Sequence, residues 1–126
     1  MHAVIAICLG ACFGALARWQ LGAWLNHPGA WLPWGTLTAN LVGGYVIGLC
    51  VAYFHHHPGL DPVWRLMLIT GFLGALTTFS SFSAEVIDML LQHRYPQAVG
   101  TVILHVAGSL LLTVAGLKTA LAFMGK

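Results

Sequence analysis

The chain has 126 residues, of which 59% are hydrophobic and only 6% are charged, far below the charged fraction of about 25% in soluble domains. Its formal net charge is +2 and its five Lys and Arg residues are scattered, which excludes a nucleic-acid-binding patch and a polybasic lipid-binding tract. The composition therefore indicates an integral membrane protein, with nearly all residues inside or at the surface of a bilayer.

A helix that crosses a bilayer needs about 20 mostly apolar residues, and several segments of the chain meet this requirement. The first apolar run has no Lys or Arg before it and is longer than a signal-peptide core, so we expect it to be retained. Breaks rich in Asn, His, Pro and Gly separate it from the segments that follow. The predicted fold is a single all-α transmembrane domain with helices over residues 3–25, 32–54, 63–91 and 96–123.

Small residues recur in the first two predicted helices. Gly10 and Gly14, and then Gly44 and Gly48, are each four residues apart, a spacing that lets helices approach closely in lipid. We expect close packing within the chain or between subunits, although glycine is also commoner in membrane helices in general. Near the end of the first helix, Arg18 is interpreted as an interfacial anchor, a donor to a helix end or carboxylate, or a positive charge at a pore mouth.

Positive charges hardly distinguish the two sides of the membrane. If the N-terminus is cytoplasmic, that side holds Arg65, Lys118 and Lys126, and the other side holds Arg18 and Arg94. Orientation follows a Lys and Arg asymmetry near the ends of the helices. A chain this balanced is expected to insert both ways, so that two opposed copies form an antiparallel dimer.

The second helix contains Asn40, at a depth where an unpaired amide is costly. We interpret this side chain either as a pore-lining donor or as an interhelical hydrogen bond that contributes about 1 kcal/mol.

The third helix is predicted to break within residues 71–83, GFLGALTTFSSFS, which place two glycines and a run of hydroxyls at membrane depth. Backbone freed by a break is tolerated there only where protein buries it or where it lines a wet cavity. Freed carbonyls then bind a cation, whereas freed amides and hydroxyls bind an anion. In the alternative, each hydroxyl bonds back to its own helix, which is a common arrangement for one such residue but not for five within seven positions.

Two aromatic residues stand within that hydroxyl run. Phe79 and Phe82 are three residues apart and share one helix face, where they either pack as core or turn their positive ring edges toward an anion. Glu85 and Asp88 follow one turn apart, and we interpret them as residues of a vestibule or as ordinary interfacial charges.

The fourth helix carries a polar residue at every fourth position: Thr101, His105, Ser109 and Thr113. This spacing makes a stripe along an otherwise apolar helix. A stripe of neutral donors suits a path for a small ion.

Three stretches, GACFGALAR at 10–18, PWGTLTANLVGG at 33–44 and GFLGALTTFSSFS at 71–83, together resemble the CrcB/Fluc fluoride channels. The match covers all four predicted helices. The resemblance implies a non-enzymatic, fluoride-selective channel that exports fluoride passively across the bacterial inner membrane and relieves fluoride toxicity. It also implies a dual-topology antiparallel homodimer with two pores.

The resemblance further implies roles for individual residues. Gly74 and Thr77 supply backbone carbonyls to a structural sodium ion at the dimer interface, where the two broken helices cross. Arg18 matches the arginine of the family's first helix and, with Glu85, is assigned to the vestibule or a structural role. The expected pore residues are Asn40, Phe79, Ser80, Phe82, His105, Ser109 and Thr113.

Two other membrane functions compete with the channel. A small multidrug antiporter needs a carboxylate embedded in the membrane, yet no Asp or Glu precedes Asp61. An intramembrane serine protease would need Ser80 or Ser81 beside His105, but the chain has only four helices and no G-x-S-x-G context. A merely structural subunit does not explain the polar stripe.

Overall fold

Residues 1–125 are described by a computed structural model, and within this range the chain is helical without a β-strand. Lys126, one of the cations compared above, lies outside the described residues. The elements are α1 (His2–Leu25), α2 (Trp34–His56), α3 (Pro62–Arg65), η1 (Leu66–Leu73), α4 (Gly74–Leu76), α5 (Phe79–Leu91), α6 (Tyr95–Ile103), η2 (Leu104–Gly108) and α7 (Ser109–Met124).

Four stretches of helix are long and apolar enough to cross a membrane. Helices α1 and α2 are the first two, the run Pro62–Leu91 is the third, and the run Tyr95–Met124 is the fourth. The predicted all-α protein with four membrane-spanning candidates is thereby confirmed. The third and fourth runs each include a π-helical segment, η1 and η2, where the backbone is wound more widely than in an α-helix.

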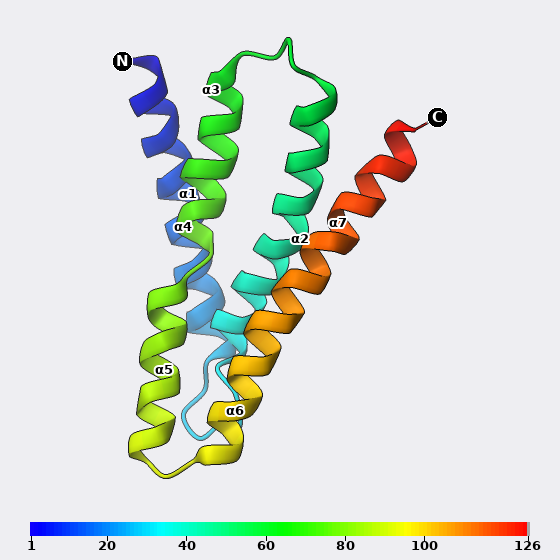
Figure 1. Cartoon of the computed structure of the whole chain (residues 1–126). Helices are drawn as coiled ribbons and strands as arrows, with labels where there is room; N and C mark the ends of the chain where they lie inside the picture. Colours follow the sequence, from blue (N-terminus) through cyan, green and yellow to red (C-terminus); the bar gives the residue numbers. More distant parts are fainter. Residues whose placement is uncertain (126) are drawn as a thin grey trace.

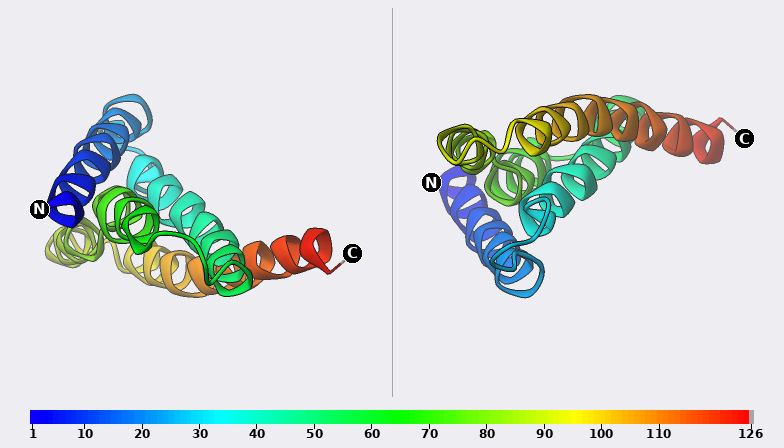
Figure 2. Two further views of the ribbon diagram at one scale, coloured as in Figure 1. Left: turned by 90° about the horizontal axis from the view of Figure 1, so that it is seen from above. Right: turned by 90° about the horizontal axis from the view of Figure 1, so that it is seen from below.

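The four runs alternate in direction. Both termini and the loop between α2 and α3 lie at one end of the molecule, and the loop after α1 and the turn between α5 and α6 lie at the other (Figure 1). Views along the helices show α1 and the end of α7 at opposite edges, with α2 and the first half of the third run between them (Figure 2). The arrangement is therefore open rather than a closed four-helix bundle.

Prolines mark the starts of the third and fourth runs. The side chain of Asp61 accepts a hydrogen bond of 2.9 Å from the backbone N–H of Val63, and Pro62 occupies the first turn of α3. Pro96 has the same position in α6. The polar, proline-containing breaks of the sequence therefore lie at the starts of the third and fourth runs.

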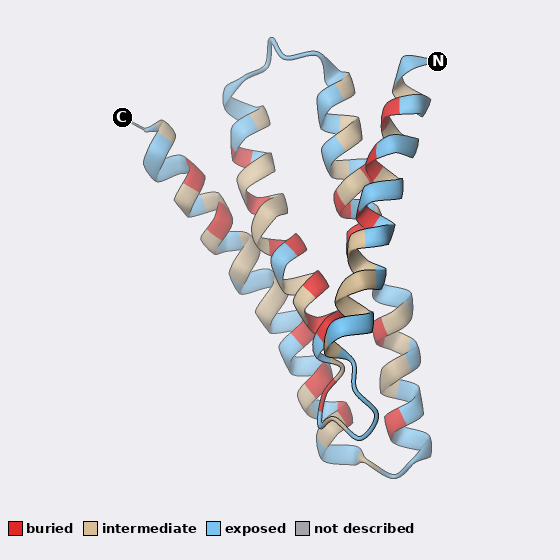
Figure 3. Ribbon diagram, turned by 180° about the vertical axis from the view of Figure 1, so that it is seen from behind, coloured by how far each residue is buried: buried red, intermediate tan, exposed pale blue. Residues whose placement is uncertain are grey.

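Buried side chains are few, and many of them are small (Figure 3). A central cluster is formed by Ala39, Leu73 and Leu76. Large apolar side chains such as Leu9, Val51 and Leu111 are instead exposed along the outer faces. Lipid is the solvent in which such faces are stable, and the chain is a multi-pass membrane protein.

Glycines set the closest helix contacts. A Cβ atom on Gly10 or Gly14 of α1 would collide with the backbone carbonyls of Met67 and Phe72, so α1 packs directly against the third run. A Cβ on Gly48 of α2 would collide in the same way with a backbone carbonyl of α7. The predicted close approach at these glycines therefore occurs within one chain.

The third run changes conformation near its middle. Helix α4 ends at Leu76, the backbone of Thr77 and Thr78 is extended, and α5 begins at Phe79. The side-chain oxygen of Thr78 accepts a hydrogen bond of 3.1 Å from the N–H of Ser81, which caps the N-terminus of α5. The two extended residues leave peptide groups that need partners outside the helix.

Candidate functional site

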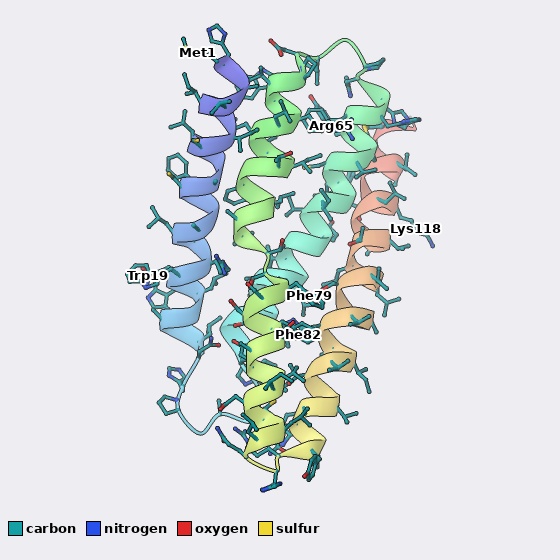
Figure 4. All side chains as sticks on the ribbon, turned by 60° about the vertical axis from the view of Figure 1, so that its left-hand side comes forward. Met1, Trp19, Arg65, Phe79, Phe82 and Lys118 are labelled. Carbon is teal, nitrogen blue, oxygen red and sulfur yellow. The ribbon has the colours of Figure 1, made fainter. Side chains whose placement is uncertain are left out.

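A groove of about 520 Å³ lies beside the two extended residues. Helix α2, the third run and the fourth run each contribute to its wall. Figure 4 places Phe79 and Phe82 near the middle of the molecule, where α5 begins. The polar and aromatic lining residues are Asn40, Thr77, Thr78, Phe79, Phe82, His105 and Ser109.

The two phenylalanines meet in this groove but differ in exposure. Their ring centroids are 5.4 Å apart with an edge-to-face tilt. Phe82 is only 7% exposed, whereas Phe79 is 77% exposed. Phe82 therefore belongs to the wall of the groove, and Phe79 presents most of its surface to the outside of this chain.

Asn40 holds the extended segment in place. Its Oδ1 accepts a hydrogen bond of 2.7 Å from the N–H of Thr78, and its Nδ2 donates one of 3.0 Å to the carbonyl of the same residue. One side chain of α2 therefore bonds to both the N–H and the carbonyl of Thr78.

His105 extends the same network to the fourth run. Its Nδ1 lies 3.0 Å from Asn40 Nδ2, and its ring stacks on Phe82 with centroids 4.7 Å apart. Its Nε2 is buried and has no hydrogen-bond partner among residues 1–125. The site thus contains a polar atom that no described residue pairs with.

The polar stripe of the fourth run divides between the groove and the helix packing. His105 and Ser109 line the groove. Thr101 is buried beside the sulfur of Met89, 3.4 Å away, and Thr113 donates a hydrogen bond of 2.9 Å to the carbonyl of Ser109 in its own helix. Neither Thr101 nor Thr113 is among the lining residues of the groove.

Arg18 reaches from α1 to the end of α4. Its Nε donates a hydrogen bond of 3.0 Å to the carbonyl of Ala75, and a second nitrogen lies 3.4 Å from the hydroxyl of Ser81. The carbonyls at the C-terminus of a helix lack partners and carry partial negative charge, so a guanidinium is well suited to this position. Of the interpretations offered for Arg18, the structure shows the donor to a helix end.

A second cavity, of about 430 Å³, lies on the other side of Thr78. Arg18, Asn26, Thr36 and Glu85 contribute to its lining. The hydroxyl of Thr36 donates a hydrogen bond to one oxygen of Glu85, and the other oxygen is buried without a partner among the described residues. Because Thr78 lines both cavities, the Asn40 network forms part of the wall between them.

The residues expected to hold sodium lie on the groove side of this wall. Gly74 and Thr77 both line the groove; Gly74 begins the short helix α4, and Thr77 is the C-cap that follows its last residue, Leu76. Backbone carbonyls at such an end are hard oxygen ligands with partial negative charge, the chemistry that a small cation needs. Within residues 1–125, no cluster of three or more His, Cys, Asp or Glu side chains is placed to hold a metal ion.

The remaining predicted residues, Ser80 and Asp88, do not line the groove. The hydroxyl of Ser80 is exposed and lies 3.2 Å from that of Thr78. Asp88 is exposed and accepts a hydrogen bond of 2.7 Å from Gln92.

Two residues at the centre of the site were not singled out from the sequence. Thr78 was one hydroxyl among several, although its place three residues before Ser81 fits an N-cap. Nothing in the sequence connects Thr36 with Glu85, which is 49 residues away. Local patterns could have identified the cap but not the long-range contact.

Comparison with known proteins places the chain among close relatives. The family model described as "CrcB-like protein, Camphor Resistance (CrcB)" matches residues 5–117. A protein of Albidiferax ferrireducens named "Fluoride-specific ion channel FluC" is 70% identical over 95% of this chain and 92% of its own length. Proteins with the same name from Paracidovorax citrulli and Pseudomonas aeruginosa are 56% and 54% identical, each over 98% of this chain and 97% of their own length.

Proposed function

Because this chain belongs to the CrcB family, we propose that it is a fluoride-selective ion channel that lets fluoride leave the cytoplasm passively and so relieves fluoride toxicity. The observation that carries this proposal is the 70% identity, over 95% of the chain, to a protein named as a fluoride-specific ion channel. The family is one of ion channels, and the chain is not an enzyme. The bacterial inner membrane is the proposed location.

The chemistry of the groove supports an anion pathway. Fluoride is small and strongly hydrated, so a pore has to replace water with donors and still release the ion. The polar atoms around the groove belong to neutral amide, hydroxyl and imidazole groups, and the aromatic rings offer positive edges. We assign the lining of the pore to Asn40, Phe79, Phe82, His105 and Ser109, with Ser80 and Thr113 farther along the path.

A second copy of the chain completes the pathway in this proposal. The groove is open on one side, and Phe79 is mostly exposed there. The near balance of Lys and Arg between the two ends of the helices lets copies insert in opposite directions. An antiparallel homodimer covers both grooves and contains two pores, and the interruption at Thr77 and Thr78 lies where the two third runs cross.

A sodium ion at the centre of that dimer is part of the same proposal. The carbonyls of Gly74 and Thr77 would come from both copies, so that each chain contributes half of the ligands. A bound cation would stabilise two opposed helix ends whose partial charges otherwise repel.

The test is efflux from liposomes that contain the purified protein. We expect fast fluoride efflux with negligible chloride efflux, and no fluoride efflux from protein-free liposomes of the same lipid. Equal efflux of both halides, or no fluoride efflux from protein that is folded and inserted, would contradict the channel assignment.

A further inference from the structure

The hydrogen bonds around Asn40 determine which way its side-chain amide points. The backbone N–H of Thr78 can only donate, and it lies 2.7 Å from Asn40 Oδ1, so this atom is the carbonyl oxygen. The other branch is therefore the NH₂ group. Its two hydrogens are used by the carbonyl of Thr78 and by Nδ1 of His105, each 3.0 Å away.

The same bonds determine where His105 carries its proton. The NH₂ group of Asn40 donates and does not accept, so Nδ1 of His105 has to be the acceptor. A neutral imidazole that accepts at Nδ1 carries its hydrogen on Nε2. An imidazolium would place two donors against each other at this contact.

The Nε2–H group of His105 is then a donor without a recipient. The side chain is only 5% exposed, and Nε2 has no hydrogen-bond partner among residues 1–125. Buried donors are nearly always paired, and leaving one unpaired costs about 1–3 kcal/mol. Since the ring lines the groove and stacks on Phe82, the acceptor that it lacks is expected from the groove.

We propose that Asn40 is a positioning residue that holds His105 in the Nε2–H tautomer, so that this neutral donor binds the permeating anion. The identity of the anion as fluoride rests on the proposed function, whereas the tautomer does not. Asn40 acts through His105 and Thr78, because both of its amide hydrogens are already used. Nε2 is covered in this structure, so binding of an anion there requires the side chains over it to move.

The tautomer can be read directly by nitrogen NMR. The full chain, labelled with ¹⁵N-histidine and reconstituted in lipid, contains seven histidines, and the resonances of His105 are those lost in His105→Gln. We expect an unprotonated Nδ1 and a protonated Nε2. A protonated Nδ1, alone or together with Nε2, overturns the assignment.

A matched pair of substitutions tests the role of Asn40. Asn40→Asp, studied at alkaline pH with ionisation verified from the carboxyl carbon shift, replaces the donor with an acceptor, so the proton of His105 should move to Nδ1. Asn26→Asp makes the same chemical change at a residue that bonds to Gly35 and Thr36, and should leave His105 unchanged. An unchanged Nε2–H tautomer beside the ionised carboxylate overturns the positioning role.

Titration with sodium fluoride tests the donor. We expect the Nε2–H proton of His105 to shift downfield with fluoride and not with sodium chloride at equal concentration. An unmoved proton in protein that still conducts fluoride refutes anion binding at this atom and leaves the channel intact. The expected tautomer in protein that conducts no fluoride refutes the channel instead and leaves the role of Asn40 standing.

Discussion

Phe82 and Phe79 line the same groove but differ in how far they are buried. Phe82 is enclosed and stacks on His105, whereas Phe79 is mostly exposed. Their spacing in the sequence predicted a shared face, and the centroid distance of 5.4 Å confirms that they meet. The sequence could not distinguish their degrees of burial, because both stand in the same hydroxyl-rich run.

Replacing Phe82 tests the role of the ring edge at this position. We expect Phe82→Ile, and likewise Phe79→Ile, to slow fluoride efflux roughly tenfold or more, which corresponds to about 1.4 kcal/mol of lost transition-state stabilisation. An aliphatic side chain fills similar space but has no positive edge for the ion. The measurement is fluoride efflux from liposomes, normalised to folded dimer.

Phe13→Ile is the matched control for these substitutions. Phe13 is 68% exposed on α1 and is not among the residues that line the groove, so its replacement should leave efflux unchanged. Wild-type rates in both groove variants would remove the rings from the mechanism.

At the scale of elements, glycine contacts decide how the helices pack. The repeated four-residue spacing predicted close approach, and the structure identifies the partners as the third run for α1 and α7 for α2. Which surfaces meet depends on the direction of each helix in three dimensions. Spacing along the sequence therefore predicts which face of a helix carries small residues, but not the surface that this face packs against.

Gly48→Ala should destabilise the protein by forcing α2 away from α7. The added methyl would overlap the backbone carbonyl of Thr113, and a backbone atom cannot move away by a change of side-chain rotamer. We expect a loss of roughly 1–3 kcal/mol, the range for overpacking in a close-packed interior. Thermal unfolding in detergent, followed by circular dichroism, measures the change.

Gly22→Ala provides the comparison within the same fold. Its Cβ would have the side-chain nitrogen of Asn26 as nearest neighbour at 3.8 Å, an ordinary contact. Alanine is also the better helix former, so this variant should be as stable as the parent or slightly more stable. Equal destabilisation by both changes would show that close approach at Gly48 is not the cause.

At the scale of the whole molecule, orientation depends on very few charges. Gln92 and Gln97 lie at the end with the α5–α6 turn, and His55 and His56 lie at the opposite end near the α2–α3 loop. Because positive residues stay in the cytoplasm, Gln92→Lys with Gln97→Lys should place the α5–α6 turn inside. His55→Lys with His56→Lys should place it outside.

A reporter fused to the C-terminus reads the orientation in cells. We expect signal from both sides of the membrane for the parent chain and from one side for each double variant. If opposite insertion is required for function, either variant alone should fail to protect cells from fluoride, and the two expressed together should restore protection. Full protection by a single one-sided variant would contradict the antiparallel dimer.

The sequence alone was sufficient to predict a membrane protein with four helices, because hydrophobicity over about 20 residues is a local property. Its motifs also identified the family and most of the polar and aromatic residues of the groove. The motifs did not determine which partner each polar side chain bonds to. Asn40 was left open between a pore donor and an interhelical bond, and Arg18 among three interpretations.

Only the tertiary structure shows which partners these two side chains have. Asn40 bonds to Thr78 across 38 positions and to His105 across 65, and Arg18 reaches Ala75 across 57. Hydrogen bonds depend on distances of about 3 Å and on which atom can donate. Spacing along a chain determines neither the distance nor the donor between separate helices. The proton on Nε2 of His105 is therefore inferred from the tertiary structure and not from the sequence.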